Sequence, residues 1–78
     1  MDIRLTRHAR NRLRLWKLNE AEVKSVLERP DRVTSSERGR KNAWKYVEGR
    51  WVRVSYGEEG QSVVAITVTV RRRGPEES

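Results

Sequence analysis

The chain has 78 residues, of which 35% are hydrophobic and 37% charged, and this allows one small domain with a thin core. It contains no cysteine and one histidine, so disulfides, thiolate metal sites and multi-histidine metal clusters are excluded. The sequence opens without an apolar stretch, and no segment is apolar enough for a membrane span. We therefore expect a cytoplasmic protein that uses no metal and no other cofactor.

The charge of the chain indicates a polyanion as its partner. Eighteen Lys and Arg residues outnumber eleven Asp and Glu residues, and fourteen of the eighteen are arginine. The planar guanidinium group pairs with phosphate through two hydrogen bonds and stacks on bases. Residues 1–17 and 32–56 each carry a net charge of +5, which favours a basic surface that binds nucleic acid. The alternatives are charge that only maintains solubility, or the Arg and Glu enrichment of a heat-adapted protein.

The N-terminal part of the sequence predicts a short strand followed by two helices. Residues 3–5 alternate in polarity, and Thr6 suits the N-cap of a helix that runs to about Trp16. Asn19 and Glu22 have the spacing of a capping box at the start of a second helix, which Pro30 ends. The short link between the two helices favours a helical hairpin.

From Asp31 onward the pattern has a period of two, which predicts strands. The predicted strands cover residues 31–36, 43–47, 51–56 and 62–71, and a basic loop follows the first of them. We expect an α+β fold with two N-terminal helices packed on one face of a twisted, mainly antiparallel four-stranded sheet. The other face would stay half open and carry Arg and Thr side chains. Residues 1–73 would form a single domain, and residues 74–78 a disordered tail.

The alternation also assigns side chains to the two faces of each strand. Trp16 and Trp44 are predicted core residues, whereas Trp51 shares a face with Arg53 and either stacks on a base or shields the sheet. The last strand is expected to have an apolar face and a polar face, formed respectively by Val64, Ile66, Val68 and Val70 and by Thr67, Thr69 and Arg71.

Four segments of the chain carry a family resemblance. Residues 5–12 (Leu-Thr-Arg-His-Ala-Arg-Asn-Arg) have a His-Ala-x-x-Arg motif, residues 19–31 form a helix pattern with a Pro-Asp exit, and residues 52–54 and 63–68 are strand patterns. In this order and spacing they resemble a family of small bacterial domains, the domain-of-unknown-function 4258 family, over residues 5–71. That family is grouped with the barnase, colicin and RelE-like ribonucleases, whose toxin members cut messenger RNA and are held inactive by an antitoxin.

The resemblance implies a RelE-like fold and a toxin-type endoribonuclease that cleaves RNA without a metal. His8 is the natural general acid or base, because histidine is the side chain that changes charge near neutral pH. Arg12 projects in the same direction one helical turn later and could clamp the phosphate. The resemblance further implies that the site is completed by Arg53, Thr67 and Arg71.

One position departs from the family pattern. Such domains often have a tyrosine or a similar side chain two residues after the strand threonine, and this chain has Thr69 there. A catalytic role attached to that aromatic side chain would have to pass to Tyr46 or Tyr56.

Further basic and aromatic side chains are predicted to bind parts of the RNA other than the phosphodiester that is cleaved. They are Arg38, Arg40, Lys41, Lys45, Trp51, Arg72 and Arg73. The expected partners are RNA, including ribosome-bound messenger RNA, and an antitoxin protein with an acidic segment. The protein itself is expected to be a monomer or a homodimer that does not bind a membrane.

Each of these interpretations has a structural alternative. His8 could be a hydrogen-bonded residue that fixes the first helical turn, and Arg12 could pair with Glu22 or Glu28 of the second helix. The run at residues 71–73 could be solvated charge. At the level of function, the alternatives are a non-catalytic RNA- or ribosome-binding module and an interaction subunit whose basic face meets an acidic protein segment.

Overall fold

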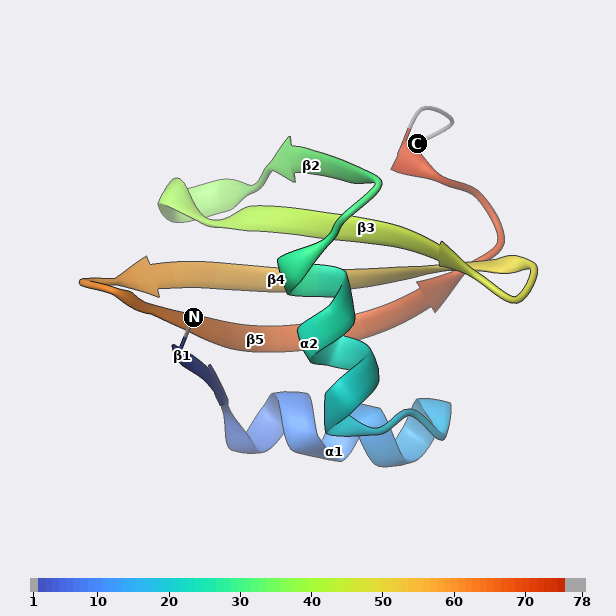
Figure 1. Ribbon diagram of the computed structural model, residues 1–78, viewed down its shortest axis with the longest axis horizontal. Coiled ribbons are helices and arrows are strands. Elements are labelled where there is room, and N and C mark those ends of the chain that lie inside the picture. Colours follow the sequence, from blue (N-terminus) through green and yellow to red (C-terminus); the bar gives the residue numbers. More distant parts are fainter. Residues whose placement is uncertain (1, 76–78) are drawn as a thin grey trace.

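The computed structural model describes residues 2–75, which form two helices and one sheet in an α+β arrangement. In chain order the elements are β1 (Asp2–Leu5), α1 (Arg7–Trp16), α2 (Glu20–Glu28), β2 (Arg32–Ser35), a 3₁₀ turn η1 (Glu37–Gly39), β3 (Lys41–Val47), β4 (Arg50–Glu59) and β5 (Ser62–Arg71) (Figure 1). Both predicted helices and the strands predicted after Asp31 are present, although β3 and β4 are longer than expected.

The sheet is mixed and has five strands in the order β1-β5-β4-β3-β2. Strands β2 to β5 pair with one another antiparallel, whereas β1 lies parallel to β5, from Asp2 opposite Ser62 to Leu5 opposite Ala65. The expectation of a four-stranded, mainly antiparallel sheet is therefore wrong. A strand of only four residues has too little alternation to reveal that its partner lies at the other end of the chain, or in which direction the two strands pair.

Both helices begin at the caps that the sequence predicts. The Thr6 hydroxyl accepts a hydrogen bond of 3.1 Å from the Ala9 backbone N–H at the start of α1. Asn19 and Glu22 form a reciprocal capping box at the start of α2, which ends ahead of Pro30. Within residues 2–75, no helix has the length and apolar character that crossing a membrane would require.

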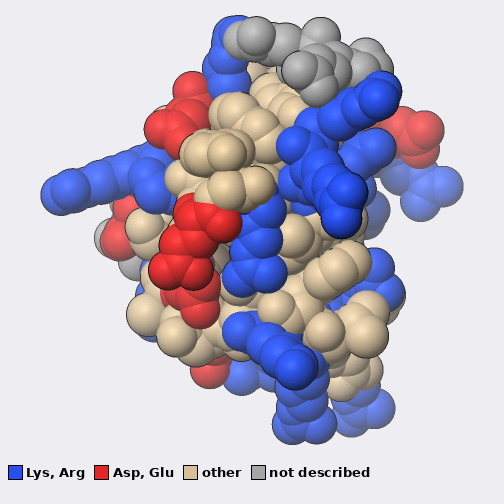
Figure 2. Space-filling view, turned by 90° about the vertical axis from the view of Figure 1, so that its right-hand side faces the viewer, with Lys and Arg blue, Asp and Glu red and all other residues tan. Residues whose placement is uncertain are grey.

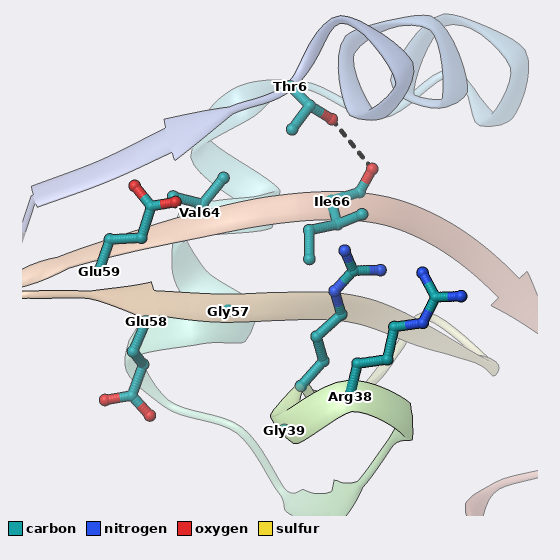
Figure 3. Close-up of a pocket in the computed structure, with 9 residues that line it drawn as sticks. Thr6, Arg38, Gly39, Gly57, Glu58, Glu59, Val64 and Ile66 are labelled. Carbon is teal, nitrogen blue, oxygen red and sulfur yellow. Dashed lines mark hydrogen bonds between the residues drawn. The ribbon is translucent and has the colours of Figure 1, made fainter.

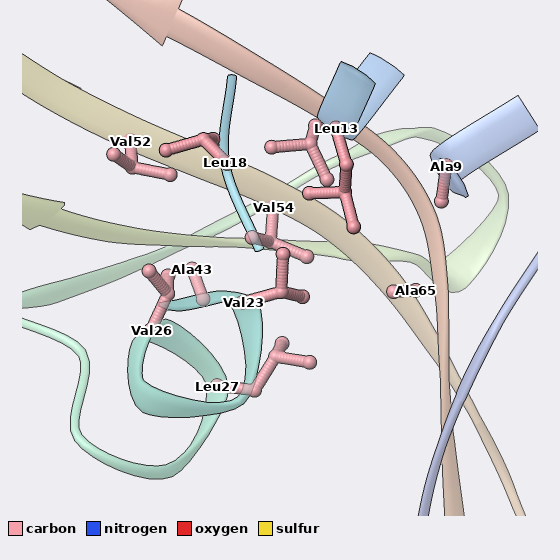
Figure 4. Packing of buried hydrophobic residues seen from close by; sticks show 11 residues of the cluster. Ala9, Leu13, Leu18, Val23, Val26, Leu27, Ala43, Val52, Val54 and Ala65 are labelled. Carbon is pink, nitrogen blue, oxygen red and sulfur yellow. The ribbon is translucent and has the colours of Figure 1, made fainter. Parts of the chain in front are cut away.

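The hydrophobic core lies between the helices and one face of the sheet (Figures 1 and 4). Helix α1 packs mainly on β5, and α2 packs on β3 and β4. The buried members of the core are Ala9, Leu13, Leu18, Val23, Val26, Leu27, Ala43, Val52, Val54, Ala65 and Val68. The two helices thus cover one face of the sheet, as expected, and leave the opposite face for polar and charged side chains.

A bulge in β5 changes the side-chain pattern of that strand. Ser55 of β4 pairs with Thr67, but the next residue, Tyr56, pairs with Ala65, so that Ile66 is an extra residue without a partner. The alternation therefore shifts by one residue at this point. The single apolar face expected for β5 is wrong, because the two pairs of side chains lie on opposite sides of the sheet: Val68 and Val70 on the core side, Val64 and Ile66 on the other.

Candidate nucleic-acid interface

The sheet face away from the helices, the open face, carries most of the residues that the sequence singles out. Strand pairing arranges its side chains in three rows across the strands. The first row consists of Thr34, Asn42, Ser55 and Thr67, the second of Arg32, Trp44, Arg53 and Thr69, and the third of Tyr46, Trp51 and Arg71. Side chains that face each other on paired strands are close neighbours, so each row runs across the sheet from strand to strand.

The first row is polar and uncharged. The Ser55 hydroxyl donates a hydrogen bond of 2.6 Å to Asn42 Oδ1. Thr67, next to Ser55, forms no side-chain hydrogen bond with any residue in the range 2–75. Its hydroxyl is therefore available to a ligand at the middle of the open face.

The second row holds a cation against a buried indole ring. Trp44 is only 3% exposed, as predicted for a core residue, and its Nε1–H donates to Thr34 Oγ1 at 3.0 Å. The Arg53 guanidinium lies 5.5 Å from the centroid of the Trp44 ring and donates a long hydrogen bond of 3.4 Å to Thr69 Oγ1. Partial burial, and then the nearby charge of Arg71, lower the pKa of Arg53 below its usual value.

The third row is aromatic and ends in an exposed arginine. Tyr46 is 54% exposed, and its ring packs edge-on against Trp51 with a centroid distance of 5.4 Å. Gly74 covers part of the Trp51 ring, because a Cβ atom at Gly74 would lie 2.6 Å from Trp51 Cε2. Disorder was predicted for residues 74–78, yet Gly74 is buried on the sheet, and residues 76–78 lie outside the described residues. Tyr46 and Arg71 are thus more accessible than Trp51.

A cleft of about 400 Å³ opens at the end of the open face that adjoins β1 (Figure 3). Four parts of the chain line it. They are Thr6 at the junction of β1 and α1, residues 38–40 at the end of turn η1, residues 57–59 of β4, and Val64 and Ile66 of β5. In Figure 3, the side chains of Val64 and Ile66 lie between Glu59 at one end and Arg38 at the other. Within residues 2–75, neither Arg38 nor Arg40 forms an ion pair with a carboxylate.

The start of α1 is fixed beside this cleft. The Thr6 hydroxyl donates a hydrogen bond of 3.0 Å to the carbonyl oxygen of Ile66, and the Thr6 backbone N–H donates to the carbonyl oxygen of Ala65 at 3.1 Å. His8 follows in the first turn of α1, and its side chain is exposed. Among residues 2–75, no hydrogen bond or ion pair involves the imidazole, which is therefore free to meet a ligand.

Arg12 lies on the same flank of α1 as His8. Arg10 lies on the side of α1 that meets α2, because its Nη1 is 3.3 Å from Glu20 Oε2. Helical periodicity places His8 and Arg12 on the opposite side of α1. The Arg12 guanidinium lies 5.9 Å from the centroid of the Trp16 ring, and its buried Nε has no hydrogen-bond partner. The pairing of Arg12 with an acidic residue of α2, considered as an alternative, does not occur in the described part of the chain.

The five residues expected to carry catalysis fall into two groups. Arg53, Thr67 and Arg71 share the open face, in three successive rows. His8 and Arg12 lie on α1, which packs against β5. None of the five lines the cleft, and no hydrogen bond or ion pair within residues 2–75 joins one group to the other.

The residues predicted to bind RNA are also divided between the two sides of the sheet. Arg38, Arg40 and Trp51 are on the open side. Lys41 and Lys45 alternate with the open-face residues of β3 and so point to the helix side, where Lys41 Nζ lies 3.5 Å from Glu58 Oε1 and Lys45 Nζ donates to the Arg29 carbonyl at 2.9 Å. Arg72 and Arg73 follow β5 and are exposed.

The charges are unevenly spread over the molecule. In the end-on view of Figure 2, Lys and Arg side chains run down the right side, and the larger group of Asp and Glu side chains lies left of centre. Because α2 lies in front of the sheet in Figure 1, the right side of Figure 2 is the side away from α2. At this end of the molecule, the open side of the sheet is therefore the more basic one, which suits a phosphate-rich ligand.

Several cleft residues were not expected from the sequence. Thr6 was predicted only as a helix cap, and Val64 and Ile66 were predicted to share one apolar face with Val68 and Val70. Gly57 and Glu59 lie outside the predicted strands, whereas β4 continues through both. The alternation of residues 51–56 does not indicate that the strand continues to Glu59, and no glycine or proline marks the bulge at Ile66.

Comparison of the chain with protein-family models, with curated proteins and with solved structures found no match.

Proposed function

We propose that this protein binds single-stranded RNA along the open face and cleaves it as a metal-independent endoribonuclease of the toxin type. The observation that carries the proposal is the bond from Thr6 to Ile66, which fixes the start of α1, with the exposed imidazole of His8, at the edge of a basic sheet face. A proton-transfer group next to a surface that holds phosphate is the minimum equipment for cleaving RNA.

The open face is long enough to hold a strand of RNA. From the cleft at Gly57 to the aromatic row at Trp51, β4 advances six residues, or about 20 Å at the usual rise of a strand. Along this distance an RNA backbone would meet Arg38 and Arg40 first, then Arg53, and finally Arg71. Tyr46, which is exposed at the far end, offers a ring on which a base can stack.

The reaction that fits these residues is an intramolecular phosphoryl transfer. A base removes the proton of a 2′-hydroxyl, the 2′-oxygen bonds to the adjacent phosphorus, and the bond from phosphorus to the 5′-oxygen breaks. The 5′-oxygen takes up a proton, and the other product ends in a 2′,3′-cyclic phosphate. We assign one of the two proton transfers to His8 and the binding of the phosphate to Arg12 and Arg71, with Thr67 and Arg53 orienting it. Water completes the second proton transfer.

The test is cleavage of labelled single-stranded RNA by the purified protein in the presence of a chelator, alone and with ribosomes. We expect products with a cyclic phosphate end, and at least a hundredfold loss of rate in His8→Ala, which is about the contribution of one acid–base group. Arg14→Ala is the matched control, because Arg14 is an exposed residue of the same helix. Full activity in His8→Ala would remove the imidazole from the mechanism.

A second function, RNA binding without cleavage, is favoured by one specific observation. The cleft with its free arginines has no histidine among its lining residues, so a phosphate held there need not meet the imidazole. This alternative gives RNA affinity that is equal in the wild type and in His8→Ala, together with intact RNA in both samples.

An antitoxin would act by covering the same face. An acidic segment laid on the open face would pair with Arg71 and with the two arginines beside the cleft, and would exclude RNA by charge and by volume. Competition between RNA and a candidate acidic partner for the wild-type protein, measured by gel shift, tests this part of the proposal.

A further inference from the structure

We propose that the cleft holds one nucleotide of the bound RNA and selects a base with an exocyclic amino group over uracil. Arg38 and Arg40 would bind the phosphate, the apolar floor would bind the base, and the Glu59 carboxylate would accept a hydrogen bond from the amino group. This inference rests on the proposed RNA-binding function and adds a base preference to it.

The cationic end of the cleft is a fixed turn with two free guanidinium groups. Arg38 and Gly39 both have positive φ, at 58° and 73°, which turns the chain sharply after β2. The turn is closed by hydrogen bonds from the Ser36 N–H to the Arg40 carbonyl at 2.8 Å and from the Arg40 N–H to the Glu37 carbonyl at 3.1 Å. Two arginines held by one rigid turn, without a carboxylate partner in residues 2–75, suit a phosphate group.

The anionic end has one free carboxylate, although two glutamates adjoin the cleft. The pairing of β4 with β5 places Glu59 on the open face together with Gly57, and Glu58 on the helix side. Glu58 is held by Lys41, whose Nζ lies 3.5 Å from Glu58 Oε1. Glu59 forms no hydrogen bond or ion pair within residues 2–75, so its oxygens are free to accept from a ligand.

The floor between these ends is apolar and has room because Gly57 has no side chain. Val64 and Ile66 stand side by side on it as a result of the bulge in β5 (Figure 3). A Cβ atom at Gly57 would have Ile66 Cδ1 at 3.8 Å as its only neighbour within 4 Å, so a side chain at this position could begin in the cleft without a close contact. A volume of about 400 Å³ is in the range of small-ligand sites.

The order of groups along the cleft matches a nucleotide better than a simple anion. A phosphate alone would use the arginines and would gain nothing from the apolar floor or from a carboxylate. A nucleotide presents phosphate, then a flat ring, then hydrogen-bonding groups on the ring edge. Cytosine and uracil differ on that edge: cytosine has an N4 amino donor, whereas uracil has an O4 acceptor, which a carboxylate repels.

The experiment is titration of the full chain with CMP, UMP and ribose 5-phosphate, followed by amide chemical shifts in NMR spectra. We expect shifts at Gly57, Glu59 and Ile66, and a dissociation constant about tenfold lower for CMP than for UMP, the usual weight of a hydrogen bond to a charged group. Glu59→Gln should abolish this preference, because the amide both donates and accepts. Gly57→Val should weaken CMP binding, whereas Glu28→Gln, on the exposed part of α2, should change neither.

Two results would overturn the inference. One is equal affinity for CMP, UMP and ribose 5-phosphate, and the other is unchanged CMP binding in Gly57→Val. Binding of long RNA, measured in parallel, separates this failure from failure of the proposed function. If long RNA binds and the base preference is missing, only the nucleotide site is wrong; if CMP binds selectively and long RNA does not bind, the site stands and the RNA-binding function fails.

Discussion

The hydroxyl of Thr6 donates a hydrogen bond of 3.0 Å to the carbonyl oxygen of Ile66, a residue 60 positions later in the chain. The hydroxyl oxygen of Thr6 also accepts a hydrogen bond of 3.1 Å from the Ala9 N–H, so this one side chain both caps α1 and connects it to β5. Ile66 is the extra residue of the bulge and also part of the cleft floor. The position of the His8 imidazole relative to the open face therefore depends on Thr6.

Replacement of Thr6 by valine removes both hydrogen bonds and keeps the shape of the side chain. We expect a loss of about 1–2 kcal/mol in the free energy of unfolding, the usual effect of losing a helix cap, measured by urea denaturation. The rate of RNA cleavage should fall by more than the decrease in the fraction of folded protein, because the first turn of α1 is no longer fixed beside β5. Thr67→Val is the stability control: Thr67 forms no side-chain hydrogen bond in residues 2–75, so unfolding should change by less than about 0.5 kcal/mol. A Thr6→Val protein as stable and as active as the wild type would contradict the role given to this bond.

Gly74→Ala should lift the end of the chain from the sheet. The added Cβ atom would lie 2.6 Å from Trp51 Cε2, and an indole packed between Tyr46 and Trp44 cannot give way as easily as the chain after β5. We expect the Trp51 indole N–H resonance to move toward the value of a solvated ring in NMR spectra. Gly57→Ala is the control, because its Cβ atom would make only an ordinary contact of 3.8 Å. An unmoved Trp51 resonance in Gly74→Ala would show that this contact is not formed in solution.

Val54→Ala should cost about 2 kcal/mol of stability, since Val54 is fully buried between the sheet and the helices and a cavity would remain. Val33, at 49% exposure on β2, is the matched control, and Val33→Ala should cost less than about 0.5 kcal/mol. Thermal or urea unfolding measures both. Similar losses for the two variants would mean that the core does not lie where the strand pairing places it.

Arg71→Gln should weaken RNA binding in a salt-dependent way. If Arg71 contacts one phosphate, the slope of log affinity against log salt concentration should become shallower by about 0.7, the value for single strands. Arg14→Gln on the outer side of α1 removes the same charge away from the open face and should leave the slope nearly unchanged. Fluorescence anisotropy of a labelled single-stranded RNA at several salt concentrations gives both slopes. Equal changes in the two variants would indicate binding by net charge alone.

Local features of the fold could be predicted from the sequence because their causes are local. The Asn19–Glu22 capping box and the exit at Pro30 depend on residues within a few positions of each other, and the structure confirms both. The placement of Trp51 and Arg53 on one face also follows from simple alternation within an uninterrupted strand. The prediction that Trp44 is buried is confirmed, although Arg53 and its neighbours on the open face cover it, not the helices.

The remaining features depend on relationships across the whole chain or on a single extra residue. The parallel pairing of β1 with β5 joins segments at opposite ends of the sequence, and a four-residue strand carries too little pattern to indicate it. The bulge at Ile66 reverses the alternation without a glycine or proline to mark it, so the cleft floor could not be foreseen. The contact of Gly74 with the Trp51 ring was not predicted, because Gly74 lies in a segment with the composition of a disordered tail.

The edge of the sheet formed by β1 has a consequence for how the protein folds. Because Asp2 to Leu5 find their partners only at residues 62–65, nearly the entire polypeptide must be available before that edge can close. Closing so large a loop reduces the entropy of the chain before the contacts between β1 and β5 can stabilise it, and this raises the folding barrier. During synthesis on the ribosome, α1 would therefore remain unanchored until β5 has been made, and the sheet would gain its β1 edge only then.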